Sequence, residues 1–78
     1  MKIFQEKKII DYCRKRQIFD QYQKSCRYIN LGLYESVELK LLKPKKKGIY
    51  QFRISGKFRG LALKKDGALF VFKISDHQ

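Results

Sequence analysis

The residues of this sequence best suited to chemistry are two arginines and one histidine in its last third. Arg53 and Arg59 flank a short Ser-Gly-Lys stretch, and His77 is the only histidine of the chain. Guanidinium groups bind phosphate through paired N–H donors, and a histidine can give or take a proton near neutral pH. Together these residue types indicate a site for an anionic, phosphate-bearing ligand.

The register of the hairpin that joins the two arginines decides whether they act together. A three-residue turn, Ser-Gly-Lys, places Arg53 and Arg59 directly opposite one another on one face, whereas a two-residue Gly-Lys turn places them on opposite faces. Directly opposed like charges destabilise a hairpin, so a shared face would indicate an anionic ligand. The alternative is a pair of solvated or carboxylate-paired arginines, and the sequence leaves both registers open.

A dense group of lysines precedes these strands. Lys43, Lys45, Lys46 and Lys47 surround the only proline, so this stretch is expected to be an exposed loop that leads into the sheet. Lysines in such a place can bind phosphate, although they also collect in loops for solubility. Lys40 adds one more cation just before the loop.

Three runs rich in aromatic and aliphatic residues carry the arginines and predict an antiparallel, three-stranded meander. They span Ile49 to Ser55, Phe58 to Lys64 and Ala68 to Ile74, and turn signals separate them. Most aromatic side chains of these runs are expected in the core: Tyr50, Phe52, Phe58, Phe70 and Phe72. Because it adjoins Arg59, Phe58 is also a candidate for stacking on a base.

The N-terminal part of the chain supplies the elements that cover one face of this sheet. Met1 to Phe4 is expected to form an edge strand against the meander. From Gln5 to Asn30 there is no Gly or Pro, and apolar residues recur near helical spacing, which indicates one long helix or a hairpin of two. Asp20 is a candidate N-cap for a second helix. Asn30 to Gly32 has the composition of a helix end, and LYESVELKLLK then fits a short helix or an extended segment.

Size and charge restrict the fold class and the partners. The 78 residues are enough for one small domain, and 44% of them are hydrophobic, which is sufficient for a core. The expected fold is α+β, with an N-terminal strand and one or two helices packed on the C-terminal meander. The 19 Lys and Arg against 7 Asp and Glu give a net charge of +12, which favours nucleic acid or an acidic protein as partner.

Two further features of the sequence concern the cellular compartment and the role of the cysteines. The sequence has no run of the length of a membrane-spanning helix and no apolar signal-peptide core at its start, so we expect a cytoplasmic protein that does not bind membranes. Cys13 and Cys26 are far from the only histidine, and their spacing is not that of a zinc site. No metal or other cofactor is expected, and the cysteines are interpreted as small core residues rather than a disulfide or redox pair.

An ordered set of motifs runs through the segment YQFRISGKFRGLALKKDGALFVFKISDH. An aromatic residue precedes an Arg-Ile strand end, and a turn, an aromatic-Arg pair, an acidic-Gly turn, an apolar strand and a terminal His follow. This set resembles the C-terminal sheet of RelE/ParE-superfamily toxins from bacterial type II toxin-antitoxin systems. The resemblance covers residues 42–78 and is strongest with compact ParE-like or HigB-like members that end in Asp-His-Gln.

The resemblance implies both a fold and a reaction. The fold is a strand, two helices and a curved antiparallel sheet whose open face binds messenger RNA in the ribosomal decoding site. There, a ribose 2′-hydroxyl attacks the adjacent phosphate. In this scheme Arg59 would steady charge on the phosphoryl oxygens, and His77 would protonate the leaving 5′-oxygen. Lys40 aligns where related nucleases carry a glutamate as general base, with Glu38 two residues earlier, so the expected base is Lys40 or Lys43.

The resemblance also implies RNA-binding residues around these positions. Arg53 and the loop lysines would hold flanking phosphates, and Gln78 stands where several active members carry a terminal tyrosine. The RNA-binding residues expected are Arg53, Lys43, Lys45, Lys46, Lys47, Lys57, Phe58 and Gln78.

The partners that follow are messenger RNA on the ribosome and an acidic antitoxin protein. The antitoxin would be a partly disordered segment that wraps the helices and the basic sheet. Two other functions stay open from the sequence. One is a ParE-like inhibitor of DNA gyrase, and the other is a non-catalytic RNA-binding domain.

Overall fold

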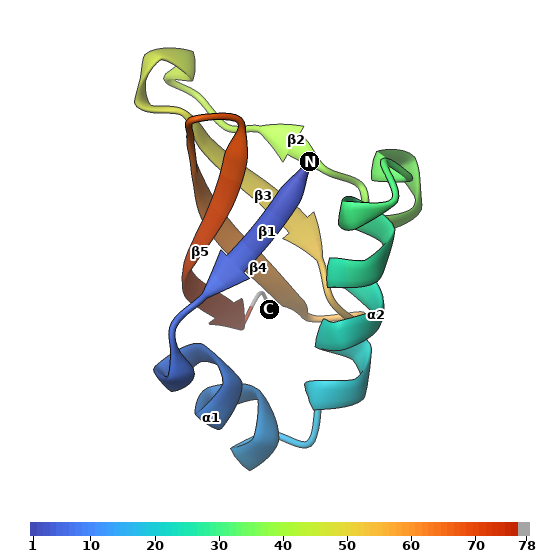
Figure 1. Ribbon diagram of the computed structural model, residues 1–78. Helices are drawn as coiled ribbons and strands as arrows, with labels where there is room; N and C mark the ends of the chain where they lie inside the picture. Colours follow the sequence, from blue (N-terminus) through green and yellow to red (C-terminus); the bar gives the residue numbers. More distant parts are fainter. Residues whose placement is uncertain (77–78) are drawn as a thin grey trace.

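The computed structural model describes residues 1–76, which form a five-stranded sheet with two helices against one of its faces (Figure 1). The strand order is β1-β5-β4-β3-β2. The strands are β1 (Lys2–Gln5), β2 (Lys40–Leu41), β3 (Ile49–Arg53), β4 (Phe58–Lys65) and β5 (Ala68–Asp76). The helices are α1 (Lys7–Lys15), α2 (Phe19–Asn30) and the short 3-10 helices η1 (Tyr34–Val37) and η2 (Lys45–Lys47). The expected α+β class is confirmed.

Strands β3, β4 and β5 form the antiparallel meander that the sequence predicts. The turn between β4 and β5 holds Asp66 and Gly67, whose φ angles are 52° and 77°. Positive φ at both central residues is the type I′ geometry, whose twist matches that of the paired strands. The second hairpin therefore forms where the Lys-Asp-Gly signal lies.

Two short strands extend the meander, one on each side. β1 lies parallel to β5, with Ile3 opposite Leu69, so the expected N-terminal edge strand is confirmed. β2 pairs antiparallel with β3, with Lys40 opposite Gln51. The segment 33–43, which the sequence left open between helix and extended chain, contains both η1 and β2.

The N-terminal part is a hairpin of two helices rather than one long helix. α1 ends at Lys15 and α2 begins at Phe19, and between them Gln17 takes a left-handed backbone conformation with a φ of 58°. Asp20 is not the N-cap of α2, because Ile18 holds that position and Asp20 lies in the first turn. An acidic side chain there still suits the positive end of the helix dipole.

The end of α2 follows the Asn-Leu-Gly signal. Asn30 is its last residue, and Gly32 has a φ of 79°. The amide of Leu33 donates to the carbonyl of Tyr28 at 2.8 Å, which completes a Schellman motif. A glycine is favoured at this position because it has no Cβ to oppose the left-handed conformation.

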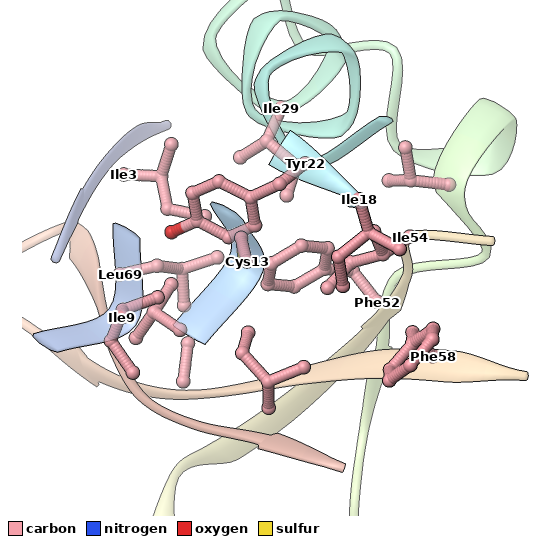
Figure 2. Close-up of a cluster of buried hydrophobic side chains, with 14 residues drawn as sticks. Ile3, Ile9, Cys13, Ile18, Tyr22, Ile29, Phe52, Ile54, Phe58 and Leu69 are labelled. Atoms are coloured by element: carbon pink, nitrogen blue, oxygen red, sulfur yellow. The ribbon is translucent and has the colours of Figure 1, made fainter. Parts of the chain in front are cut away.

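The core lies between the helix hairpin and the sheet (Figure 2). Phe52 of β3 is fully buried, and its ring covers Gly60 of β4 so closely that an added Cβ would fall within 2.9 Å of three ring atoms. The Tyr22 hydroxyl donates to Oε1 of Gln5 at 2.8 Å, which connects α2 to β1. The Ser25 hydroxyl of α2 donates to the carbonyl at the end of β3 at 2.8 Å. These contacts fix the helices over one face and leave the other face open.

The two cysteines pack in or against this core, as the sequence predicts. Cys13 is fully buried, Cys26 is partly buried, and both are free thiols. Burial raises the pKa of each thiol to about 11. Neither is therefore a thiolate near neutral pH, which is the form that reacts and that binds metals.

Candidate nucleic-acid interface

The face of the sheet turned away from the helices carries its side chains in rows that cross the strands. Two of these rows contain most of the cations of the face. The first row is Arg53, Arg59 and Ser75, and the second is Lys40, Gln51, Leu61 and Lys73. Because residues paired across strands point to the same face, the register alone brings these side chains together.

Arg53 and Arg59 stand directly opposite one another at the end of the first hairpin. The amide of Ile54 donates to the carbonyl of Phe58 at 3.0 Å, so the turn holds the three residues Ser-Gly-Lys. Of the two registers that the sequence left open, this is the one that places both arginines on one face. Directly opposed cations disfavour pairing, so this end of the hairpin gains from a bound anion.

The side chain of Arg59 is held by the turn beside it. Its Nη1 donates to the carbonyl of Ser55 at 2.7 Å, to that of Phe58 at 3.2 Å and to that of Gly56 at 3.4 Å. Within residues 1–76, all the hydrogen bonds of this side chain use Nη1. A guanidinium group has five N–H donors, so the Nε and Nη2 donors are left for a ligand.

Glu38 is the acidic residue beside the arginine pair. Its Oε2 lies 3.8 Å from Nη1 of Arg53, and both side chains are largely exposed. An exposed ion pair of this kind contributes about 0 to 1 kcal/mol to stability. Glu38 also has a left-handed backbone conformation, with a φ of 51°, directly after η1. Such a conformation is uncommon outside glycine, and it places a carboxylate at the edge of the basic face.

These side chains line one hollow of about 240 Å³, which we call the arginine hollow. Its lining residues are Glu38, Lys40, Gln51, Arg53 and Arg59. Three cations face one carboxylate, so a phosphate in the hollow would meet an excess of positive charge. The carboxylate supplies a proton acceptor at the same place.

The lysine loop, residues 43–48, lies at the other end of β3 (Figure 1). Its Gly48 carbonyl accepts a hydrogen bond from the amide of Lys64 at 2.9 Å, so the loop adjoins the far end of β4. Arg53 is five positions along the strand from Gly48, which corresponds to about 17 Å. Among the described residues the arginine hollow therefore receives Lys40 but none of the loop lysines.

Phe58 and Lys57, two residues expected to bind RNA, have partners within the protein. Phe58 is buried in the core, so its ring is not free to stack on a base, and this expectation is not met. Lys57 extends beside it, with Nζ 5.3 Å from the ring centroid and 3.8 Å from Oδ2 of Asp76. The first hairpin thus presents Arg59, rather than its neighbours, to the open face.

Phe70 and Phe72 are exposed, so the expectation that they lie in the core is wrong. Phe70 lies on the open face and stacks on Phe4. Phe72 is the extra residue of a bulge in β5, between Val71 and Lys73, which pair with consecutive residues of β4. The run ALFVFKI is apolar at nearly every position, so its alternation could not separate the two faces. That uniformity in a sheet with one open face is itself the signal that some of these side chains would be exposed.

The proposed general acid and its neighbour, His77 and Gln78, lie outside the described residues. The structure reaches Asp76, which pairs with Phe58, and Ser75, which pairs with Arg59. β5 therefore ends at the end of the sheet that carries the arginine hollow.

Comparisons with protein-family models, with curated proteins and with solved structures found no match. Within residues 1–76, no helix is long and apolar enough to cross a membrane. The same residues contain no group of three or more His, Cys, Asp or Glu placed to hold a metal ion. A function for this chain therefore has to be inferred from the chemistry of the open face.

Proposed function

We propose that this chain is the toxin of a type II toxin-antitoxin system and acts as a ribosome-dependent mRNA endoribonuclease of the RelE/ParE superfamily. The observation that supports the proposal is the direct opposition of Arg53 and Arg59 in one hollow of the open face. In the absence of an anion, this arrangement costs stability. Phosphates bound at the two guanidinium groups offset the repulsion, and a phosphoryl group that gains charge during a reaction offsets more of it.

In the proposed reaction, a ribose 2′-hydroxyl attacks the adjacent phosphorus and the bond from phosphorus to the 5′-oxygen breaks. A 2′,3′-cyclic phosphate and a free 5′-hydroxyl result. Arg59 has Nη1 anchored by the turn carbonyls and turns its remaining donors to the phosphoryl oxygens. Arg53 holds a neighbouring phosphate. His77 protonates the leaving 5′-oxygen, as the resemblance implies.

The arginine hollow offers two candidates for the general base, Glu38 and Lys40. A carboxylate can accept a proton at neutral pH, whereas a lysine ammonium has no free lone pair. Lys43, the other base expected from the sequence, belongs to the lysine loop at the far end of β3. We therefore assign the base to Glu38 and give Lys40 the role of a phosphate ligand.

The proposed protein partner is an acidic antitoxin. The chain has a net charge of +12, so an acidic segment that lies across the open face would neutralise it. The same segment would block access of RNA to the arginine hollow. Inhibition and neutralisation would then share one surface.

Inducible expression in a bacterial host tests this proposal, with growth followed alongside primer extension on a reporter mRNA. The wild-type chain should stop growth and produce cuts in phase with codons. Arg59→Ala and Glu38→Gln should remove the cuts, because one removes the phosphoryl ligand and the other the proton acceptor. Lys15→Ala is the matched control, since it removes one exposed cation from the end of α1, outside the hollow. Growth arrest without cuts would contradict the nuclease and point to DNA gyrase as the target.

A further inference from the structure

A row of apolar side chains crosses the open face between the arginine hollow and the lysine loop. The register aligns its members across β3, β4, β5 and β1. We call it the apolar row: Ile49, Leu63, Phe70 and Phe4. Leu63, Phe70 and Phe4 are 42%, 44% and 45% exposed, which is unusual for large apolar side chains that stand side by side.

The apolar row lines a groove of about 650 Å³. Phe72, from the bulge of β5, adds a further exposed ring to the lining. The rings of Phe4 and Phe70 are stacked, with centroids 5.4 Å apart and an angle of 26° between their planes. This stacked pair is partly open to solvent at the sheet surface, so it forms an aromatic platform to which another flat ring can be added.

Positive charge borders the apolar row on both sides. One neighbouring row contains Lys2 and Lys65, and the lysine loop adjoins it at the end of β3. The row on the other side contains Lys40 and Lys73, and the arginine pair follows. The acidic residue that lines the groove is Glu6. A ligand that fits this surface therefore combines flat apolar groups with repeated negative charge.

We propose that the groove binds the bases of a single-stranded nucleic acid, while lysines and arginines on either side hold its phosphates. Every base offers an aromatic face, so stacking on Phe4 and Phe70 needs no particular sequence. Sheets that expose aromatic rings among cations are a recurrent platform for unpaired RNA bases. In a duplex the base faces are covered by neighbouring bases, so the platform selects single strands.

The position of the groove favours a nucleic acid over an acidic peptide. Leu63 and Arg59 lie on the same face of β4, four residues or about 13 Å apart. A strand that extends along β4 would place bases on the apolar row and a phosphate in the arginine hollow. The inference rests on the proposed function for the identity of this strand as messenger RNA, and it assigns the groove to nucleotides beside the cut.

Binding of labelled oligonucleotides tests the inference separately from cleavage. The probe is a single-stranded RNA with 2′-O-methyl groups, which lacks the attacking hydroxyl, and its partner is an abasic strand with the same phosphates. We expect the abasic strand to bind the wild-type protein about tenfold more weakly, because stacked bases contribute to affinity in addition to the phosphates. Equal affinity of the two strands would overturn the inference.

A substitution of Phe70 tests whether the aromatic platform causes the difference in affinity between the normal and the abasic strand. Phe70→Leu keeps an exposed apolar side chain but removes the ring, so it should reduce the advantage of the normal strand by about threefold or more and leave abasic binding unchanged. Phe19→Leu is the matched control, because Phe19 begins α2, on the helix side of the sheet. If Phe70→Leu leaves RNA affinity unchanged but weakens binding of an acidic protein, the groove is a protein-docking surface and the inference is wrong.

Two readouts keep this inference distinct from the proposed nuclease. Arg59→Ala should abolish cutting of mRNA on ribosomes and leave the ratio between normal and abasic affinity unchanged. Base-dependent binding without any cutting would contradict the nuclease and support the groove. Cutting without base-dependent binding would contradict the groove and support the nuclease.

Discussion

At the scale of single residues, the arginine pair lowers the stability of the free protein and favours the binding of an anion. Arg53 and Arg59 oppose one another across the hairpin, and Arg59 is anchored by the turn while Arg53 lies near Glu38. Threonine or valine would suit these strand positions better. Residues that weaken the free protein and strengthen a complex are typical of binding sites.

Replacing Arg53 with threonine should therefore stabilise the free protein. Arg53→Thr removes the opposed charge, and the exposed pair with Glu38 that is lost contributes little. We expect the free energy of unfolding to rise by about 0.2–1 kcal/mol at low salt. Urea unfolding at low and high salt measures it, and the gain should shrink as salt screens the repulsion. A loss of stability at low salt would show that the arginines do not repel one another in the free protein.

The buried thiols make a second prediction at the residue scale, which concerns alkaline pH. Burial raises the pKa of Cys13 and of Cys26 from 9.0 to about 11, and it also raises that of Tyr22. A raised folded-state pKa means that the unfolded chain loses these protons first. The contribution to stability is therefore complete below pH 9 and is lost as pH rises towards 11.

Urea unfolding across this pH range should show falling stability for the wild type. Cys13→Ala removes one of the titrating thiols and should show a smaller decrease over the same range, although its stability at neutral pH is lower. The comparison between the two slopes isolates the contribution of the thiol, because every other group is common to both proteins. Identical slopes would contradict the assigned cause.

At the scale of elements, the contact between β3 and β4 depends on the absence of a side chain at Gly60. The ring of Phe52 lies over Gly60, and an added Cβ would come within 2.9 Å of three ring atoms. Phe52 is fully buried, so it has no space into which it could turn. The neighbouring Gly56, in the first turn, has no atom within 4 Å of an added Cβ.

Gly60→Ala should destabilise the protein by about 1–3 kcal/mol, the usual cost of overpacking a core. Gly56→Ala is the matched control and should change the free energy of unfolding by less than about 0.5 kcal/mol. Thermal or urea unfolding of both variants measures the difference. Equal stability of the two variants would mean that the ring of Phe52 does not rest on Gly60.

The elements that the sequence predicts are those with a local signal. The meander follows from three apolar runs and two glycine turns, and the end of α2 follows from Asn-Leu-Gly. The break between the helices contains no Gly or Pro, and Gln17 takes the left-handed conformation there instead of a glycine. The sequence alone therefore could not choose between one helix and two. β2 is only two residues long, too short for any periodicity to show it.

For the candidate site, too, the sequence predicts some features and not others. The sequence identifies Arg53, Arg59 and Lys40 by type, but their meeting in one hollow depends on a turn length that it leaves open. The lysine loop is adjacent in sequence to the arginine strands, yet the length of β3 separates it from the arginine hollow. Phe70 is missed because an apolar strand does not reveal which of its residues face solvent.

At the scale of the whole molecule, the net charge determines which molecules the protein attracts. The net charge of +12 lies on a chain of 78 residues, so the free protein attracts any polyanion. Specific contacts on the open face must add to this attraction. The arginine hollow and the apolar row are the places where the structure offers them.

The affinity for single-stranded RNA should therefore fall steeply as salt rises. Each phosphate neutralised in a single strand contributes a slope of about 0.7 to the fall of log affinity with log salt. Fluorescence titrations at several salt concentrations measure the slope, and replacing two loop lysines, Lys45 and Lys46, with glutamine should reduce it. A flat response would mean that the positive charge does not contact the RNA backbone.

Cutting of an mRNA by the purified protein on purified ribosomes tests the proposed nuclease. Rates for the wild type are compared with those of Arg59→Lys, which keeps the charge but loses the planar guanidinium group and its anchored geometry. We expect codon-phased cuts by the wild type and a rate at least about a hundredfold lower in the variant, because a positioned donor to the phosphoryl oxygens is lost. Cutting by Arg59→Lys at the wild-type rate would contradict the role of Arg59, and no cutting by the wild type at all would contradict the proposed nuclease.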